Sequence, residues 1–233
     1  MADAPLIQPF PSPNFNERRE ASQPTMLVMH YTGMQSATAA LTRLCTPDAD
    51  VSAHYLIEED GRIYQMVADH KRAWHAGVGN WRGITDINSA SIGIEIVNPG
   101  HEFGYRPFPE PQMASVLWLS RKIVQQYDIE PFNVIGHSDL APVRKVDPGE
   151  LFNWRMLAEN GVGIWPIDYA DDPGDETMFL ENLKFIGYDV TDPEMVTAAF
   201  QRHWRQTEIS GKIDMETRVL AATLRKQVAH LTK

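Results

Sequence analysis

Asn133–Gly149 reads NVIGHSDLAPVRKVDPG, a run that begins like a buried strand and ends in closely spaced titratable side chains. The small and apolar residues before His137 favour a strand, and His137 falls at its carboxyl end. Asp147 follows across a loop that contains a proline. Ligands of open sheets collect beyond the carboxyl ends of the strands. The run therefore predicts a functional site at a sheet edge, provided that other segments supply partners there.

A second apolar run also ends near a histidine. Met26–Tyr31 reads MLVMHY, which favours a buried strand with His30 near its end. Two imidazoles and one carboxylate, with a fourth position open to water, form a common catalytic zinc shell. His30, His137 and Asp147 are therefore candidate zinc ligands. Their spacing alone leaves the assignment open, because His30 lies far from the other two in the sequence.

Glu95 is an unusual residue because it lies within a third apolar run. Ser91–Asn98 reads SIGIEIVN, and its period-two alternation puts the three isoleucines on one face and Glu95 on the other. A carboxylate in so apolar a strand needs a partner. The ordinary alternative to a functional role is a glutamate that is ion-paired or exposed at a sheet edge.

The remaining pattern interleaves strands with helices. Residues 54–67 alternate around an Asp-Gly pair, as a β-hairpin does. Apolar residues recur at helical spacing in residues 112–127, and residues 153–160 are followed by a glycine that can end a helix. This order predicts the α/β (α+β) class, with a mixed central β-sheet flanked by helices.

Composition divides the chain into four parts. Residues 1–24 contain five prolines and are predicted to form an extended N-terminal arm. Residues 25–162 hold the strands and helices described above. Residues 163–176 are rich in Gly, Pro and Asp, which indicates a linker. Residues 177–233 are expected to form a small C-terminal three-helix bundle, of a size that folds alone only marginally.

Helix signals mark this C-terminal part. Apolar spacing predicts helices over residues 177–185, 193–205 and 215–231. Thr191 stands three residues before a glutamate, as in a capping box, and Asp214 stands where an N-cap residue is expected.

Composition also limits the partners and the compartment. The net charge of −10 disfavours binding to nucleic acid, which recruits lysine and arginine. The sequence has no apolar run long enough to span a bilayer and no pattern of a secretory signal, so we expect a cytoplasmic protein; the alternative is the periplasm or cell envelope, if an export signal was removed. Cys45 is the only cysteine, so a metal must be held by histidine and carboxylate.

Several motifs, in order, resemble one known family. They are MHYTG, SAHYLIEEDGRIYQMV, AWHAG, SIGIEIVN, GHSDLAPVRKVDPG and FNW, and they span roughly residues 20–160. They are similar to the zinc-dependent N-acetylmuramoyl-L-alanine amidases of type 2, the AmpD- and AmiD-like enzymes related to peptidoglycan recognition proteins. The C-terminal part resembles the peptidoglycan-binding domain found beside such amidases. The resemblance thus implies a zinc amidase domain over residues 25–162 and a peptidoglycan-binding-like domain over residues 177–233.

The resemblance also assigns roles to five residues. It implies that His30, His137 and Asp147 hold one Zn²⁺ per chain. Glu95 would be the catalytic acid and base, and Lys145 would lie near the developing oxyanion. These roles fit the chemistry, since attack on an amide needs both a proton acceptor and a cation near the new negative charge.

Five further residues are expected around this centre. Trp74 and His75 are predicted to line a substrate groove, because aromatic faces suit sugars and peptide stems. Arg144 is expected to bind a carboxylate of the stem peptide, or to be an ordinary surface arginine. His54 is either a second-layer partner of a ligand or a packed core imidazole. Asp139 either orients a ligand or caps the loop.

The expected function is hydrolysis of the amide between N-acetylmuramic acid, or its anhydro form, and L-alanine, in peptidoglycan or muropeptides. A rival expectation is a recognition module that binds peptidoglycan without cleaving it, although such relatives lack a full ligand set. A metallopeptidase of the HExxH type is disfavoured because that motif is absent. We expect a monomer, in which the bundle either tethers the enzyme to murein or packs on the amidase domain.

Overall fold

A six-stranded sheet lies at the centre of the computed structural model, which describes residues 5–19 and 23–232. The strand order is β1-β5-β4-β7-β3-β8. β4 and β5 are antiparallel, as the predicted hairpin requires, and the other neighbouring pairs are parallel. The sheet is therefore mixed, as predicted. Its strands are β1 (Ile7–Pro9), β3 (Met26–Tyr31), β4 (Tyr55–Ile57), β5 (Ile63–Gln65), β7 (Ser91–Ile96) and β8 (Val134–Gly136).

The segment predicted as an N-terminal arm lies against this sheet where it is described. β1 adds to the edge strand β5, and β2 (Phe15–Glu17) pairs with β6 (Lys71–Ala73) in a separate two-stranded sheet. Predictions for residues 1–4, 20–22 and 233 fall outside the described residues.

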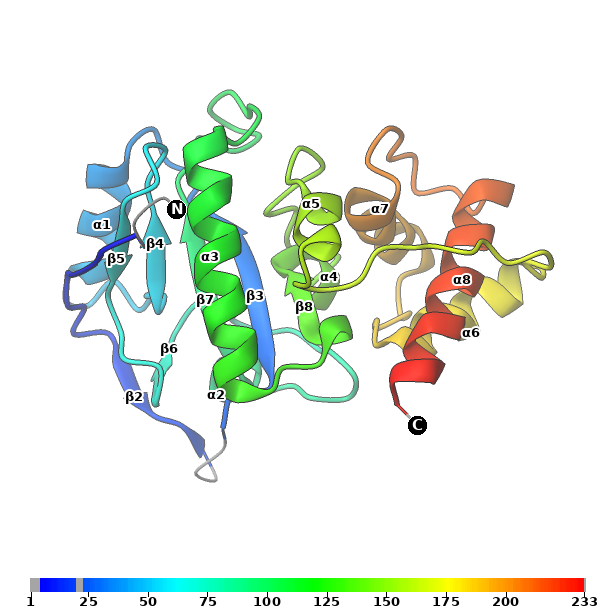
Figure 1. Cartoon of the computed structure of the whole chain (residues 1–233), viewed down its shortest axis with the longest axis horizontal. Helices are drawn as coiled ribbons and strands as arrows, with labels where there is room; N and C mark the ends of the chain where they lie inside the picture. The colour runs from blue at the N-terminus through cyan, green and yellow to red at the C-terminus, as the bar shows by residue number, and fades with distance from the viewer. Residues whose placement is uncertain (1–4, 20–22, 233) are drawn as a thin grey trace.

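Helices cover both faces of the sheet. α3 (Glu110–Tyr127) packs on the face formed by the three isoleucines of β7, and α1 (Ala37–Cys45) packs near β4 on the other face. In Figure 1, α3 crosses in front of the sheet and α1 lies at its outer end. Three shorter helices complete this part: α2 (Ile87–Ala90), α4 (His137–Leu140) and α5 (Trp154–Glu159), with a 3₁₀ turn, η2 (Pro131–Asn133), before β8. Residues 5–162 are called the sheet part below.

The C-terminal part forms the three predicted helices: α6 (Glu176–Ile186), α7 (Pro193–Trp204) and α8 (Met215–Leu231). Asp214 caps α8 as predicted, since its carboxylate accepts the backbone N–H of Thr217. The predicted capping box at Thr191 is wrong by one residue. Asp192 is the N-cap of α7 and accepts the N–H of Met195, because the proline at the first helical position starts the helix directly after Asp192. These helices are called the C-terminal bundle.

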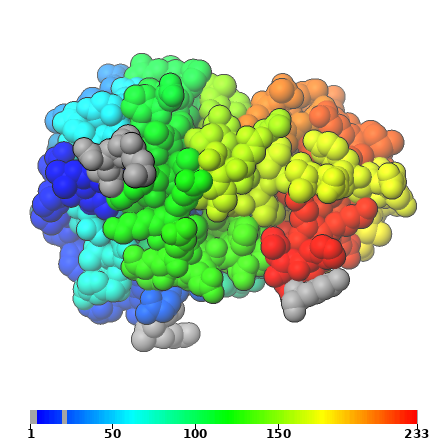
Figure 2. Space-filling model, viewed as in Figure 1, coloured from blue at the N-terminus to red at the C-terminus, as the bar shows by residue number. Residues whose placement is uncertain are grey.

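The C-terminal bundle shares a hydrophobic core with the sheet part. Met26, Val28 and Ile135 of the sheet belong to the same buried cluster as Phe179 and Phe200 of the bundle. Figure 2 shows the bundle, in yellow, orange and red, seated directly against the sheet part. The intervening residues 163–176 are also held, because the carbonyl of Trp165 accepts a hydrogen bond from Gln227 and the N–H of Ala170 donates to Thr223. Among the described residues, no helix has the length and apolarity needed to cross a bilayer.

Asp139 joins the two parts. Its Oδ2 accepts the N–H of Gly136 and the Nδ1–H of His203, both at 2.7 Å, and its Oδ1 accepts the Tyr188 hydroxyl at 2.8 Å. The His203 ring is stacked between Trp154 and Trp204, with centroid distances of 3.9 and 3.8 Å. Asp139 therefore caps the start of α4 and binds the bundle. The alternative expectation, that Asp139 orients a metal ligand, does not agree with these contacts, because both of its carboxylate oxygens accept hydrogen bonds from these donors.

Candidate metal centre and active site

The sheet places three functional residues at one edge. β3 and β7 are parallel, and their register pairs His30 with Glu95, so both side chains point to the face opposite α3. β8 pairs on the other side of β3 and ends at Gly136, so His137 follows at the same carboxyl edge. Asp147 lies in the loop after α4 and returns to this edge, where its carbonyl accepts the N–H of Ser138 at 2.9 Å.

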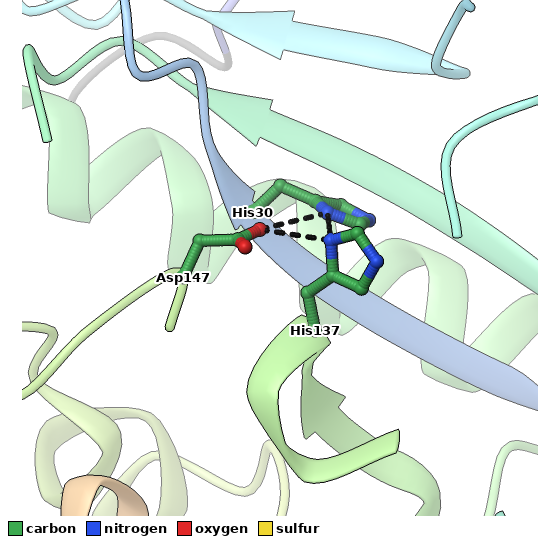
Figure 3. A group of neighbouring side chains, drawn as sticks. All are labelled: His30, His137 and Asp147. Carbon is green, nitrogen blue, oxygen red and sulfur yellow. Dashed lines mark hydrogen bonds and ion pairs between the residues drawn. The ribbon is translucent and has the colours of Figure 1, made fainter. Parts of the chain in front are cut away.

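Three side-chain atoms converge there (Figure 3). His30 Nδ1 and His137 Nδ1 are 2.9 Å apart, and each lies 3.1 Å from Asp147 Oδ2. Ligand atoms of a tetrahedral zinc ion with bonds of about 2.0–2.1 Å lie about 3.3 Å from one another, which is close to this spacing. His30, His137 and Asp147 form a group that could hold a metal ion.

The hydrogen bonds around this group fit a cation. His137 Nε2 lies 2.8 Å from the carbonyl oxygen of Ala76, which can only accept, so the imidazole hydrogen is on Nε2 and Nδ1 presents a lone pair to the group. Burial and the neighbouring His137 lower the pKa of His30 to about 4, so its ring is neutral at pH 7. Two imidazole nitrogens and a buried carboxylate oxygen form the donor set of a divalent metal ion.

Glu95 is held in an unusual electrostatic setting. Its Oε2 is buried and has no hydrogen-bond partner among the described residues. Burial and the charge of Asp147 raise the pKa of Glu95 well above its usual range, against the opposing effect of Lys145. A carboxyl group with a raised pKa beside a candidate metal site is typical of a general acid and base.

A pocket of about 370 Å³ opens onto these residues. His30, His137, Asp147, Glu95 and Lys145 all line it. The Lys145 ammonium has no hydrogen-bond or ion-pair partner in the described part of the chain, so it is available to a negative charge in the pocket. The five residues predicted from the resemblance are thus brought together in one cavity.

The residues predicted to bind substrate are placed differently. Trp74 lies outside the pocket lining, and its indole N–H donates to Asn16, because the residue follows β6 and turns toward β2. Arg144 lines the pocket, but its Nη2 donates to the carbonyls of Ala76 and Val78. Its guanidinium therefore braces the backbone beside His137 as well as facing the cavity.

His75 and His54 lie behind the metal group. His75 lines the pocket floor, but its ring is buried and contacts His30, with 2.9 Å between Nδ1 of His75 and Nε2 of His30. His54 lies one ring further back, where its Nδ1 accepts the N–H of Gly93 and its Nε2 lies 3.1 Å from the carbonyl of Lys71. Of the two alternatives, the structure places His54 as a core imidazole. Burial and the charge of Arg18 lower the pKa of His54 to about 3, so the ring is neutral at pH 7.

Sequence reasoning missed two residues that support this centre. Ser91 Oγ lies 3.1 Å from His75 Nε2, and Asn88 Oδ1 accepts the backbone N–H groups of both His75 and Ala76. Serine and asparagine are common, and neither has a local signal that points to a site. Their roles depend on how β7 and α2 pack on the turn after β6, which a single sequence does not specify.

Three side chains that could hold a metal ion converge beside a pocket, with a buried carboxyl oxygen next to them, and this arrangement is typical of three-ligand metal sites in enzymes. The family model for N-acetylmuramoyl-L-alanine amidase matches residues 20–150, which is more than half of the chain. The chain belongs to this family.

Curated relatives agree with this assignment. The chain is 38% identical over 230 residues to the N-acetylmuramoyl-L-alanine amidase AmiD of Escherichia coli strain K12, a match that covers 85% of this chain and 81% of that protein. It is 36% identical over 161 residues to the 1,6-anhydro-N-acetylmuramyl-L-alanine amidase AmpD of Salmonella typhimurium strain SL1344, covering 62% of this chain and 84% of that protein.

Solved structures show the same fold. A complex of the E. coli amidase AmiD with the substrate anhydro-N-acetylmuramic acid-L-Ala-D-γ-Glu-L-Lys matches 92% of this chain and 98% of that one, with a TM-score of 0.79 and 35% identity. AmpDh3 from Pseudomonas aeruginosa matches 89% of this chain and 93% of that one, with a TM-score of 0.81 and 32% identity. These matches extend over most of the chain.

Proposed function

We propose that His30, His137 and Asp147 hold one zinc ion at the active centre of this N-acetylmuramoyl-L-alanine amidase. The observation that carries the proposal is the convergence of two imidazole Nδ1 atoms and one carboxylate oxygen within 3.1 Å at the floor of a pocket. Such a shell with one open position suits a catalytic zinc ion, which lowers the pKa of a water molecule and polarises a carbonyl group when bound.

Glu95 and Lys145 supply the remaining chemistry in this proposal. Glu95 accepts a proton from the attacking water and passes it to the nitrogen of L-alanine as the amide bond breaks. The raised pKa of Glu95 suits this exchange, because the group must take up a proton and release it again. The Lys145 ammonium, which lines the same pocket, stabilises the negative charge that develops on the amide oxygen.

The substrate class we propose is an N-acetylmuramoyl peptide, either in murein or as a released anhydro-muropeptide. Support comes from the AmiD complex, whose ligand is an anhydro-N-acetylmuramic acid tripeptide, and from the coverage of 92% of this chain by that fold. Arg144 faces the pocket and adjoins a second hollow of about 430 Å³ that is lined by both the sheet part and the C-terminal bundle. A peptide stem that leaves the catalytic pocket can continue into this second hollow.

Metal analysis and two variants test the assignment of roles. We expect about one zinc ion per chain in the purified protein and much less in His137→Ala, which removes one ligand. Glu95→Gln should keep the zinc and the fold but lose about 10²–10⁴-fold in turnover, since an amide of similar size cannot accept the proton. Glu102→Gln, on an exposed loop, is the matched control. Zinc retained at full stoichiometry in His137→Ala would overturn the ligand assignment.

Product analysis separates the two substrates and the rival function. Mass spectrometry of products from purified sacculi and from soluble anhydro-muropeptides, at equal enzyme concentrations, shows which is cleaved faster. A recognition module would bind both and release no free peptide. The cytoplasm stays a prediction, which fractionation of the source cells would test.

A further inference from the structure

A chain of hydrogen bonds runs from His30 to a buried backbone carbonyl. His30 Nε2 lies 2.9 Å from His75 Nδ1, and His75 Nε2 lies 3.1 Å from Ser91 Oγ. Ser91 Oγ lies 2.6 Å from the carbonyl oxygen of Ile87. All three side chains are buried, so water does not compete for these contacts.

The carbonyl oxygen of Ile87 determines which group donates and which accepts in each of these hydrogen bonds. A carbonyl oxygen can only accept, so the Ser91 hydroxyl donates its hydrogen to Ile87. Ser91 Oγ is then left to accept, and His75 Nε2 must donate to it. A neutral imidazole carries one N–H, so His75 Nδ1 accepts a hydrogen bond from the Nε2–H of His30. The Nδ1 lone pair of His30 is thereby directed at the metal group.

One further observation supports a fixed position for His75. The ring lies directly on β7 at Gly93, where an added Cβ would come within 2.5 Å of its Cγ and Nδ1. Only glycine at this position leaves room for the ring.

We propose that His75 and Ser91 are positioning residues that fix the hydrogen of His30 on Nε2 and so present its Nδ1 to the metal. Ala76, the next residue, does the same for His137 through its carbonyl oxygen. Asn88 holds this two-residue turn in place by accepting both of its backbone N–H groups. One short turn therefore orients both imidazole ligands before a metal binds, which lowers the reorganisation needed on binding.

The test compares two substitutions of similar size at one position. His75→Leu fills the space but has no acceptor for the Nε2–H of His30, whereas His75→Asn provides an oxygen near the place of Nδ1. The zinc dissociation constant of each metal-stripped protein is measured by competition with a chromophoric chelator. We expect His75→Leu to bind zinc about 10–100-fold more weakly than the wild type, as for other partners of metal ligands. His75→Asn should recover most of that loss.

A second variant and a direct measurement keep the proposal testable if His75→Leu does not fold. Ser91→Ala removes the acceptor of His75 Nε2–H with little change in volume, and it should also weaken zinc binding, though less than His75→Leu does. Ser120→Ala is the matched control, because Ser120 Oγ is buried without a partner among the described residues. Nitrogen-15 NMR of the metal-free wild type should show both His30 and His75 protonated on Nε2.

The outcomes separate this proposal from the metal assignment on which it rests. A wild-type protein that binds no zinc would refute the role of His30 as a ligand. Zinc affinity that is unchanged in folded His75→Leu, or in Ser91→Ala, would refute the positioning role alone. A metal-free wild type with His30 protonated on Nδ1 would refute it as well.

Discussion

Within the described part of the chain, the buried Oε2 of Glu95 has no hydrogen-bond partner, and it lies next to the group formed by His30, His137 and Asp147. An unsatisfied buried polar atom costs about 1–3 kcal/mol, so the fold retains it at the expense of stability. Natural proteins keep such groups mainly where function requires them. The cost also gives a measurable signature in the metal-free protein.

The contribution of Glu95 to the free energy of unfolding of the metal-free protein should fall as pH rises above about 4. The unfolded chain releases the Glu95 proton near pH 4.3, whereas the folded state keeps it longer because its pKa is raised. Between these two pKa values the folded state binds more protons, so raising the pH favours unfolding. Glu95→Gln lacks this dependence and should be the more stable protein at about pH 8.

Thermal unfolding in the presence of a chelator measures this difference. The gain in Tm of Glu95→Gln over the wild type should be small at about pH 4, where both states are protonated, and larger at about pH 8. Glu102→Gln should show no such trend, since its side chain is exposed. An equal gain at both pH values would contradict the raised pKa.

The strands and helices that build the site were predictable from local pattern. MLVMHY, SIGIEIVN and the run before His137 all form strands, because each is an apolar stretch bounded by polar or turn residues. His30, Glu95 and His137 meet because parallel strands end at the same edge. The contacts of His75 with Ser91 were not predictable, since they depend on how segments distant in sequence pack together. Trp74 was assigned to a groove by residue type alone, and the structure places it elsewhere.

Asp139 shows a similar limit at the junction of α4 and α7. The sequence indicates that helices of the C-terminal part are amphipathic, but not which surface their apolar faces cover. Asp139 accepts hydrogen bonds from His203 and Tyr188, which lie far along the chain. The sequence therefore leaves open whether Asp139 orients a metal ligand or caps the loop, and it gives no sign that this side chain also binds the bundle.

Tyr188→Phe tests this junction. The change leaves Asp139 Oδ1 and the indole N–H of Trp204 without their partner, both in a buried setting. We expect the free energy of unfolding to drop by about 1–3 kcal/mol, measured by chemical denaturation. Tyr169→Phe is the control, because Tyr169 is 61% exposed and should change stability little. Equal losses in both variants would argue against a structural role of the Tyr188 hydroxyl.

The whole chain is expected to unfold as one unit, because its main core crosses the boundary between the sheet part and the C-terminal bundle. Phe179 and Phe200 of the bundle lie in the same cluster as Val28 and Ile135 of the sheet. Of the two expectations for the bundle, packing on the amidase domain is the one this geometry favours. Binding of murein by the bundle stays a prediction.

Removing everything after Asp175 should therefore damage the catalytic part itself. The truncation exposes apolar side chains of β3, β8 and α4, and we expect a lower Tm, aggregation and weaker activity even on a small muropeptide. Calorimetry of the full chain should show one transition. A soluble truncation with the wild-type Tm and with full activity on small substrates would support an independent tether instead.

Because the C-terminal bundle packs on the sheet part, the distance between the bundle and the catalytic pocket is fixed. A module on a flexible linker lets an enzyme sweep over many bonds around its anchor, whereas Asp139, His203 and the shared core hold this bundle in one orientation. A murein strand bound by the bundle would therefore be cleaved at one constant distance from the position where it is bound. In an ordered polymer, the cleaved bonds would then lie at regular intervals from each binding position.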